Sequence, residues 1–279
     1  MNTDIISLIS DFGNKDPFAG IMKGVILSIN REVTVIDLCH EIPAQDILKA
    51  AICLNMSYTF FSANSLHVVV VDPGVGGKRK IIFLRTPGGC FLAPDNGVLS
   101  LVLQRGFEKM GDYPVPGNIT ELPSGFEAFK VDNKDFWLKP TSSSFHGRDI
   151  FAPVAAHYSL GVPLEKLATP CDAMLYRPLP LAKETDGVIE GLVIYVDHFG
   201  NLVTNITAKM LAHKSTWKFR IGKLLINGLC KFYGEGRDYL ALIGSHGYLE
   251  IARKNGNAFQ SLGIKSKQEV IVEDAGGDD

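Results

Sequence analysis

Residues 68–85 read VVVVDPGVGGKRKIIFLR, and this stretch decides the fold. The four consecutive valines are typical of a strand buried on both faces, as in the middle of a parallel sheet. The strand must end at Asp72-Pro73-Gly74, because proline lacks a backbone donor and glycine permits a turn. Asp72 therefore follows the carboxyl end of a central strand, where open α/β sheets bind their ligands. A turn aspartate followed by a solvated basic cluster at residues 78–80 is the alternative interpretation.

Strands and helices alternate in the first half of the chain. Residues 5–9 and 33–38 are short apolar runs that predict strands, and residues 80–85 predict the strand after the central one. Asp16-Pro17 begins a helix with apolar residues at helical spacing, and residues 45–60 predict a second helix. Because this alternation implies right-handed crossovers, we expect an α/β domain with a mainly parallel central sheet.

The second half of the chain has a different pattern. Residues 166–186 are the predicted linker, because they are rich in proline and show little periodicity. Beyond it, short β-rich runs such as residues 188–196 and 239–243 alternate with turns of Gly, Asn and His. We predict an N-terminal α/β domain over residues 1–165 and a C-terminal all-β, barrel-like domain over residues 187–279.

Composition limits the partners and the compartment. A hydrophobic content of 46%, a charged content of 21% and a net charge of −2 predict a globular protein that binds neither nucleic acid nor an anionic membrane. No apolar run approaches the length of a membrane span, and the N-terminal residues do not have the pattern of a signal peptide. The five cysteines are scattered and form no CxxC pair, which favours reduced thiols in a cytoplasmic protein.

Familiar nucleotide and metal motifs are missing from the sequence. The glycine loop after residue 72 is no Walker A loop, which would need glycine in place of Asp72 and Ser or Thr in place of Arg79. A GxGxxG loop after a strand and an HExxH pattern are also missing, and the histidines have no ligand spacing. We therefore predict no metal site and no phosphate cradle.

Polar residues instead follow the ends of apolar elements. These residues are Asp11 after the first strand, Asp72 and Arg79 around the central strand, and His146 at the start of a helix. A strand-end carboxylate facing a crevice can accept hydrogen bonds from both hydroxyls of a ribose. Asp11 could equally be a turn carboxylate before a helix, and His146 could be a capping or core histidine. The residues alone leave these alternatives open.

A set of short motifs runs through both halves of the chain. In order, they are SDFG (10–13), VTVIDLCHEIPAQD (33–46), VVDPGVG (70–76) with Arg79, APDNG (93–97), SSFHGRD (143–149), DHFGNLVTNI (197–206) and GSHGYLEIARKNGNA (244–258). Together they resemble the S-adenosyl-L-methionine (SAM) hydrolases, or SAM hydroxide adenosyltransferases, of the fluorinase/chlorinase superfamily. The resemblance extends over nearly the whole chain.

The resemblance implies a fold, an assembly and a reaction. An α/β domain and a β-barrel would form a homotrimer with active sites between subunits. SAM and water would give adenosine and L-methionine, with SAM as substrate and no cofactor.

Site residues carry over by position. Asp72, Arg79 and His146 fall on the set that handles the water, and Asp11 falls on the ribose-binding carboxylate. In the C-terminal domain the resemblance assigns contacts with adenine and with the methionine amine and carboxylate to Asp197, Phe199, Asn201, Ser245, His246, Arg253 and Asn255.

Departures from the halogenases favour water over halide. Gly147 stands where a halogenase carries a halide-binding serine, and Asp72-Pro73 replaces a Tyr-Pro loop. An arginine stands in the halogenases where this chain has His246. The long N-terminal-domain insertion of the halogenases is also missing.

Hydrolysis of SAM is chemically consistent with these residues. The sulfonium leaves as a neutral thioether and needs no general acid, whereas water, with a pKa near 15.7, must be oriented and deprotonated. Asp72 and His146 could accept the proton, with Arg79 fixing Asp72, and no metal is required. The alternatives are a calcium-dependent nucleoside N-ribohydrolase, which needs a cluster of aspartates and would lose activity with chelator, and a non-catalytic SAM- or nucleoside-binding protein.

Overall fold

The computed structural model describes residues 3–111, 113–213, 216–264 and 267–275. The chain divides into two compact units, Met1–Pro178 and Leu179–Asp279. Each unit is described by itself below.

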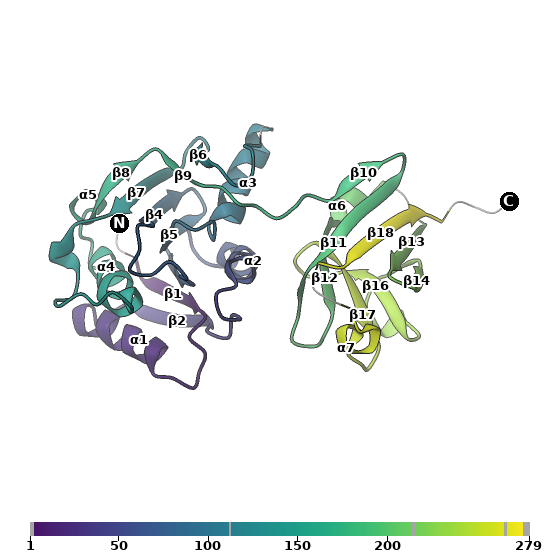
Figure 1. Ribbon diagram of the computed structural model, residues 1–279, viewed down its shortest axis with the longest axis horizontal. Coiled ribbons are helices and arrows are strands. Elements are labelled where there is room, and N and C mark those ends of the chain that lie inside the picture. The colour runs from purple at the N-terminus through teal and green to yellow at the C-terminus, as the bar shows by residue number, and fades with distance from the viewer. Residues whose placement is uncertain (1–2, 112, 214–215, 265–266, 276–279) are drawn as a thin grey trace. The chain divides into compact units, whose positions relative to one another are not determined.

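The first unit is an α/β domain (Figure 1). Its elements in chain order are β1 (Ile5–Ser10), α1 (Phe18–Ile29), β2 (Thr34–Cys39), α2 (Ile47–Ser57), the 3-10 turn η1 (Tyr58–Phe60), β3 (Leu66–Val70), β4 (Ile81–Thr86), β5 (Gly89–Pro94), α3 (Ser100–Met110), β6 (Ile119–Glu121), β7 (Glu127–Val131), the 3-10 turn η2 (Lys134–Phe136), the π-helix η3 (Gly147–Phe151), α4 (Ala152–Ser159), α5 (Leu164–Leu167), β8 (Ala168–Cys171) and β9 (Ala173–Leu175).

The main sheet of this unit has the strand order β2-β1-β3-β5-β4-β7-β8. The pairs β1–β2, β1–β3 and β3–β5 are parallel, so the strand-helix crossovers predicted from the sequence are confirmed. The strand after the central one, β4, is instead antiparallel to β5, and β7 and β8 extend the sheet in antiparallel fashion. The glycine-rich stretch thus connects β3, in the parallel centre of the sheet, to β4, in its antiparallel extension.

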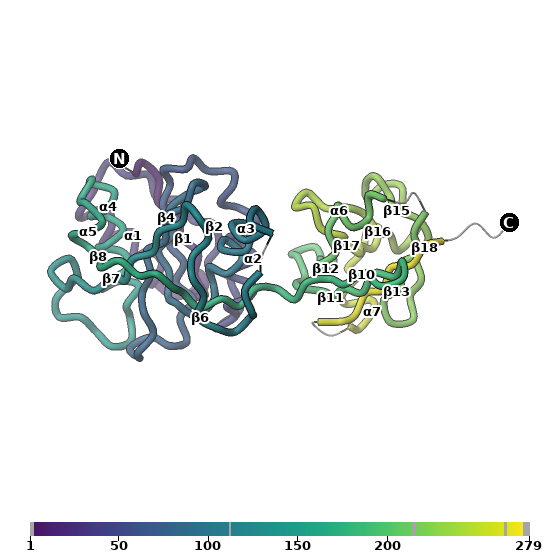
Figure 2. The backbone as a smooth tube through the Cα atoms, turned by 90° about the horizontal axis from the view of Figure 1, so that it is seen from above, coloured from purple at the N-terminus to yellow at the C-terminus, as the bar shows by residue number. Residues whose placement is uncertain are grey.

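Helices cover both faces of this sheet. Figures 1 and 2 show α1, α4 and α5 on one side and α2 and α3 on the other. Alternate residues of the strands face the α1–α4 side, among them Val68 and Val70 of β3, which pack in one core with Met22 and Ile26 of α1. This two-sided burial explains the uninterrupted valine run.

Two strands lie within the range predicted to be a linker. β8 pairs with β7, and β9 pairs with β6, so residues 168–175 belong to the first unit. Proline does not prevent this, because Pro170 sits in β8 at the end of the sheet order, where one side of a strand needs no ladder bonds. The compact units divide between Pro178 and Leu179.

The second unit is built from a strongly curved sheet. Its elements are β10 (Lys183–Thr185), β11 (Val188–Val196), β12 (Leu202–Thr207), α6 (Ala208–Leu211), β13 (Trp217–Ile221), β14 (Leu224–Asn227), β15 (Leu229–Cys230), the 3-10 turn η4 (Tyr233–Glu235), β16 (Tyr239–Ile243), β17 (Tyr248–Arg253), α7 (Ala258–Leu262) and β18 (Glu269–Asp274).

The curved sheet has the order β14-β13-β18-β11-β12-β17-β16-β15, with β10 paired to β11. β14 also contacts β16, so the sheet nearly closes on itself around a core that includes Trp217 and Phe219. The predicted all-β, barrel-like fold is confirmed. None of the helices among the described residues has both the length and the apolar character needed to cross a membrane.

Candidate active site

Asp11 and Asp72 lie at the same edge of the first unit's sheet. Asp11 follows β1, Asp72 comes two residues after the end of β3, and these parallel strands are neighbours with Ser10 opposite Val70. Parallel neighbours end at the same edge, so both carboxylates reach one crevice. The Asp11 side chain accepts a hydrogen bond at Oδ2 from the Gln45 backbone N–H at 2.8 Å.

Asp72, Arg79 and His146 form one hydrogen-bonded set. Arg79 Nε lies 3.0 Å from Asp72 Oδ1 and 2.9 Å from Oδ2, and Arg79 Nη2 donates to Oδ2 as well. Arg79 Nη2 is also 2.7 Å from His146 Nδ1. The side chains of Arg79 and Asp72 are only 12% and 5% exposed. Arg79 is therefore no member of a solvated basic cluster but the link between a carboxylate and an imidazole.

The contact with Arg79 fixes the tautomer of His146. A guanidinium has donors only, so Nδ1 must be the acceptor, and a neutral His146 carries its proton on Nε2. Burial and the adjacent Arg79 charge lower the pKa of His146, although Asp72, Asp149 and the Ser142 backbone act in the opposite direction. The imidazole is thus held in its neutral form near neutral pH. His146 also precedes the π-helix, yet its side chain makes no capping hydrogen bond there.

Glycines let the two loops of this set approach each other. Gly76 has a φ of 76°, and a Cβ there would lie 2.3 Å from the Ser143 carbonyl oxygen. The loop after β3 therefore packs directly on the loop that carries His146. Asp149, which is 1% exposed, holds this second loop by accepting the Ser142 backbone N–H at 2.7 Å.

Gly147, which follows His146, packs closely against the side chains around it. A Cβ on Gly147 would lie 3.1 Å from Met22 Sδ, 3.2 Å from the Phe145 ring and 3.3 Å from the Phe12 ring. Phe12 and Phe145 also pack edge to face with ring centres 5.7 Å apart. A larger residue at position 147 would have to displace the Phe12 and Phe145 rings.

The residues around this site line a cavity of about 240 Å³. Three of the four predicted residues of this unit line it, and the fourth, Arg79, binds two of them. The lining residues are Asp11, Phe12, Gln45, Val70, Asp72, Pro73, Val75, Ser144, Phe145, His146 and Gly147.

The second unit has a larger cavity of about 950 Å³. All of the residues predicted for the C-terminal domain line it: Asp197, Phe199, Asn201, Ser245, His246, Arg253 and Asn255. They come from the β11–β12 turn and from both ends of β17, which are distant in sequence and adjacent in the sheet. The structure thus gathers the predicted residues into one group in each unit, and their contacts with a substrate stay predictions.

The β11–β12 turn holds its polar groups rigidly. Asp197 accepts the Asn201 backbone N–H at Oδ1 (2.8 Å) and the Asn201 amide at Oδ2 (2.9 Å). Gly200 has a φ of 86°, and a Cβ there would overlap Asn257. Asn201 is 5% exposed, whereas Phe199 is 73% exposed, so an aromatic face is offered to the cavity beside a fixed carboxylate.

Arg253 is also fixed before any ligand binds. Its Nε donates to Asp238 Oδ1 at 2.8 Å, and its Nη1 donates to Ser261 Oγ at 2.7 Å. The guanidinium lies over the ring of Tyr239, 5.4 Å from the ring centre. Asn255 follows in the left-handed region, with a φ of 54°.

Sequence reasoning missed Glu250 and Tyr233, which line the same cavity. Glu250 is 6% exposed, and the Tyr233 hydroxyl donates to its Oε2 at 2.8 Å. Burial, and secondarily the charge of Asp197, raise the pKa of Glu250 despite the bond from Tyr233. A carboxylate inside the apolar strand β17 was the signal that could have revealed Glu250.

Protein-family models match both units. Residues 6–168 match the SAM hydroxide adenosyltransferase N-terminal domain, and residues 191–271 match the C-terminal domain of the same family.

Relatives and solved structures match over nearly the full length. The (R)-S-adenosyl-L-methionine hydrolase of Methanocaldococcus jannaschii is 34% identical, covering 96% of this chain and 95% of that protein. A protein of the same name from Thermus thermophilus is 31% identical, covering 95% of this chain and 98% of that protein. A fluorinase of Actinopolyspora mzabensis is 24% identical over 96% of each chain. A crystal structure of a conserved protein from Thermotoga maritima superposes with a TM-score of 0.84 at 32% identity, covering 96% of this chain and 99% of that one.

These matches confirm the resemblance that the sequence motifs indicated. With both domain models matched in order, the chain belongs to the SAM hydroxide adenosyltransferase family.

Proposed function

We propose that this protein hydrolyses SAM at the ribose C5′ to give adenosine and L-methionine. The observation that carries this proposal is the Asp72–Arg79–His146 set, which borders the same small cavity as Asp11. This set offers an acceptor and a donor for one water molecule beside a carboxylate suited to ribose. Membership of the family and the names of the relatives support the same reaction.

We propose that two side chains divide the work on the water. His146 accepts from Arg79 at Nδ1, so its Nε2–H is the atom that can donate to the water oxygen. Asp72 Oδ1 accepts only one of the Arg79 bonds and retains a lone pair, so Asp72 is the acceptor for the water proton. In this proposal His146 is a donor that orients the water, whereas the sequence-based expectation was that both side chains could accept the proton.

The leaving group needs no help from an acid. Cleavage of the C5′–S bond turns a sulfonium into a neutral thioether, and the bond pair stays on sulfur. The water oxygen forms the new bond to C5′ while its proton passes to Asp72. Because hydroxide and sulfonium neutralise each other along this path, a poorly hydrated pocket lowers the barrier. The proposal requires no metal ion or cofactor.

The two cavities would hold different parts of SAM. Ligand pockets typically measure about 300–1,000 Å³, so a cavity of about 240 Å³ suits only the ribose and the reacting water. The larger cavity would take adenine against Phe199 and Asn201, and the methionine ammonium against Asp197. The Asp197 carboxylate provides the charge that an ammonium group needs.

We further propose a homotrimer in which each active site joins the first unit of one subunit to the second unit of its neighbour. A heterologous contact that closes after three subunits forms such a ring. The site residues divide cleanly between the units, which is the arrangement that a shared site requires.

The proposed location is the cytoplasm. All five cysteines are free thiols, as is usual in a reducing compartment.

The direct test is incubation with SAM followed by chromatography for adenosine, with and without chelator. The proposal predicts equimolar adenosine and methionine, unaffected by chelator. Release of free adenine that stops with chelator would support the N-ribohydrolase instead. The side chains do not favour that reaction, since the described residues contain no group of three or more His, Cys, Asp or Glu placed to hold a metal. Binding of SAM without turnover would indicate a binding protein.

Complementation tests the shared site. His146→Ala and Asn201→Ala each disable one half, and mixed trimers of the two variants are formed by co-expression. If neighbouring subunits share each site, random mixing restores about a quarter of the sites, because each half is intact with a probability of about one half. Mixtures as inactive as the separate variants, despite proven subunit exchange, would place the whole site within one chain.

A further inference from the structure

The loops that follow β1 and β2 are joined by hydrogen bonds around Asp11. Gly13 N–H donates to the His40 carbonyl at 2.8 Å, and the Asn14 amide donates to Glu41 Oε1 at 2.7 Å. The Gln45 backbone N–H donates to Asp11 Oδ2 itself at 2.8 Å. The direction of the Asp11 carboxylate therefore depends on how the second loop lies against the first.

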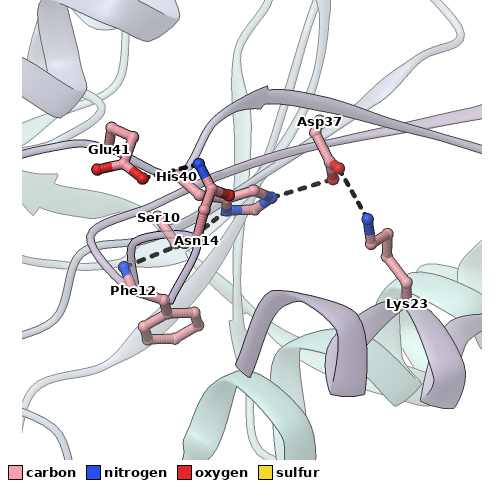
Figure 3. A network of polar contacts seen from close by, with 7 residues as sticks. All are labelled: Ser10, Phe12, Asn14, Lys23, Asp37, His40 and Glu41. Atoms are coloured by element: carbon pink, nitrogen blue, oxygen red, sulfur yellow. Dashed lines mark hydrogen bonds and ion pairs between the residues drawn. The ribbon is translucent and has the colours of Figure 1, made fainter. Parts of the chain in front are cut away.

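A buried chain of side chains lies beneath this junction (Figure 3). Ser10 Oγ is 2.7 Å from His40 Nδ1, and His40 Nε2 is 3.0 Å from Asp37 Oδ1. Ser10 is 1% exposed and His40 is 6% exposed. At the surface end of the chain, Lys23 Nζ donates to Asp37 Oδ2 at 2.7 Å.

The hydrogen bonds among Ser10, His40 and Asp37 all run from the serine towards the aspartate. The Asp37 carboxylate can only accept, so the neutral His40 ring carries its proton on Nε2 and donates it to Asp37. His40 Nδ1 then accepts from the Ser10 hydroxyl, whose oxygen also accepts the Phe12 backbone N–H at 3.4 Å. Burial acts to raise the pKa of Asp37, but the bonds from Lys23 and His40 outweigh it and lower the pKa. Asp37 thus stays ionised and gives His40 a charged acceptor.

The Ser-His-Asp order here does not serve nucleophilic catalysis. Ser10 is the last residue of β1 and almost wholly buried, so no substrate carbon can approach its Oγ. The chain instead connects the residues on both sides of Asp11: Ser10 precedes Asp11, and Phe12 follows it.

We propose that Ser10 and His40 are positioning residues that hold Asp11 in the geometry required to bind the ribose hydroxyls of the nucleoside. This inference rests on the proposed function, because it assigns Asp11 to the ribose. Hydrogen bonds to a ribose diol require both hydroxyls to be met at once, so a displaced carboxylate loses both. The loss should appear in binding of the nucleoside rather than in attack by water, which Asp72 and His146 carry out.

Strand β1 offers a matched control. Ser7 is also buried, at 0% exposure, and its Oγ lies 2.6 Å from Nδ1 of another buried histidine, His67. Ser7 and Ser10 therefore each contact Nδ1 of a buried histidine from the same strand, but only Ser10 adjoins Asp11 and accepts the Phe12 backbone N–H. Ser10→Ala and Ser7→Ala each remove one buried Ser–His bond and should lower the unfolding midpoint by similar amounts.

The test measures adenosine binding by calorimetry, together with KM and kcat for SAM. Ser10→Ala should weaken adenosine binding and raise KM by about tenfold with kcat within about threefold, since a hydrogen bond to a charged group contributes a factor of this order. Ser7→Ala should leave both quantities unchanged. Equal effects of the two substitutions on adenosine binding would overturn the proposal, because the loss would then reflect stability alone.

A double-mutant cycle separates action through Asp11 from a direct contact. Asp11→Ala alone should weaken adenosine binding by about 10-fold to 100-fold. Adding Ser10→Ala to Asp11→Ala should then change binding less than twofold, because nothing remains to be positioned. Independent losses that multiply would refute the assignment. Failure of the wild-type protein to bind adenosine or SAM would instead refute the proposed function.

A second pair keeps the inference testable if Ser10→Ala does not fold. Asp37→Asn removes the charged acceptor of His40, and Lys23→Met removes only the half-exposed ion pair at the outer end. Asp37→Asn should weaken adenosine binding about threefold or more, whereas Lys23→Met should not, as is usual for surface pairs. The reverse order would contradict the proposal.

Discussion

Arg79 is the residue whose replacement tests most clearly the proposed role of the Asp72–Arg79–His146 set. Arg79→Met removes the fork on Asp72 and the bond to His146, whereas Arg79→Lys keeps a charge but cannot reproduce the planar fork. Both changes leave Asp72, 5% exposed, without its bidentate partner. Hydrogen bonds to charged groups contribute about 1.5–3 kcal/mol each, and two such bonds to reacting groups correspond to about a 100-fold to 10⁴-fold loss of rate.

We therefore expect kcat to fall by about 100-fold or more in both variants. KM for SAM should stay within about threefold, because Arg79 acts through Asp72 and His146 and is not among the described residues that line the cavity. A loss of kcat/KM that lies mainly in KM would contradict this reasoning.

The pH dependence makes the test sharper. His146 must be neutral to accept from Arg79, so activity is lost as the pH falls through the pKa of His146. Burial and the Arg79 charge lower this pKa below its usual 6.5, so the acid limb of the wild-type profile should lie below pH 6.5. Arg79→Met removes the neighbouring cation and should raise the pKa of His146, whereas Arg79→Lys should raise it less.

The wild-type limb is read from the initial rate of adenosine release over the pH range in which histidine titrates. The pKa of His146 in all three proteins is read from an NMR titration of its ring. A pKa of His146 that stays in place or falls in Arg79→Met would refute the electrostatic coupling between Arg79 and His146.

Three further predictions follow from other parts of the molecule. Asp11→Ala should raise KM by about 10-fold to 100-fold with little change in kcat, and an unchanged KM would remove Asp11 from the ribose site. Chloride or fluoride should give no 5′-halo product even in Gly147→Ser, whose Cβ would meet Met22 and Phe145 at 3.1 Å and 3.2 Å; a halogenated nucleoside on chromatography would overturn this. Burial lowers the pKa of His67 to about 4 in the folded protein. Between pH 6.5 and pH 4 the unfolded chain therefore binds a proton at this residue that the folded protein does not, so the free energy of unfolding falls by about 3 kcal/mol as the pH is lowered. This fall should vanish in His67→Leu, as acid unfolding curves can show.

The sequence revealed those parts of the fold and the site that depend on local pattern. The valine run and the Pro-Gly turn located β3 and Asp72, because a strand buried on both faces and a lost backbone donor are both visible in the residues themselves. The short β-rich runs of the second unit were located for the same reason, with β11 and β16 matching the predicted ranges.

Tertiary contacts decided what the sequence could not show. β4 follows the central strand in the chain but pairs antiparallel with β5, since the turn at Pro87-Gly88 folds the two into a hairpin. The proline-rich segment gains β8 only because β7 is there to pair with it. Only the fold reveals that Arg79 turns inward to bind Asp72, and that Glu250 of β17 faces a cavity.

The path of one oxygen atom tests the central claim most directly. SAM is turned over in heavy-oxygen water, and the products are analysed by mass spectrometry. If a water held by Asp72 and His146 attacks C5′, as we propose, one heavy oxygen should appear in the 5′-hydroxyl of adenosine and none in methionine. Unlabelled adenosine, or label at C1′ of a sugar released with free adenine, would contradict it.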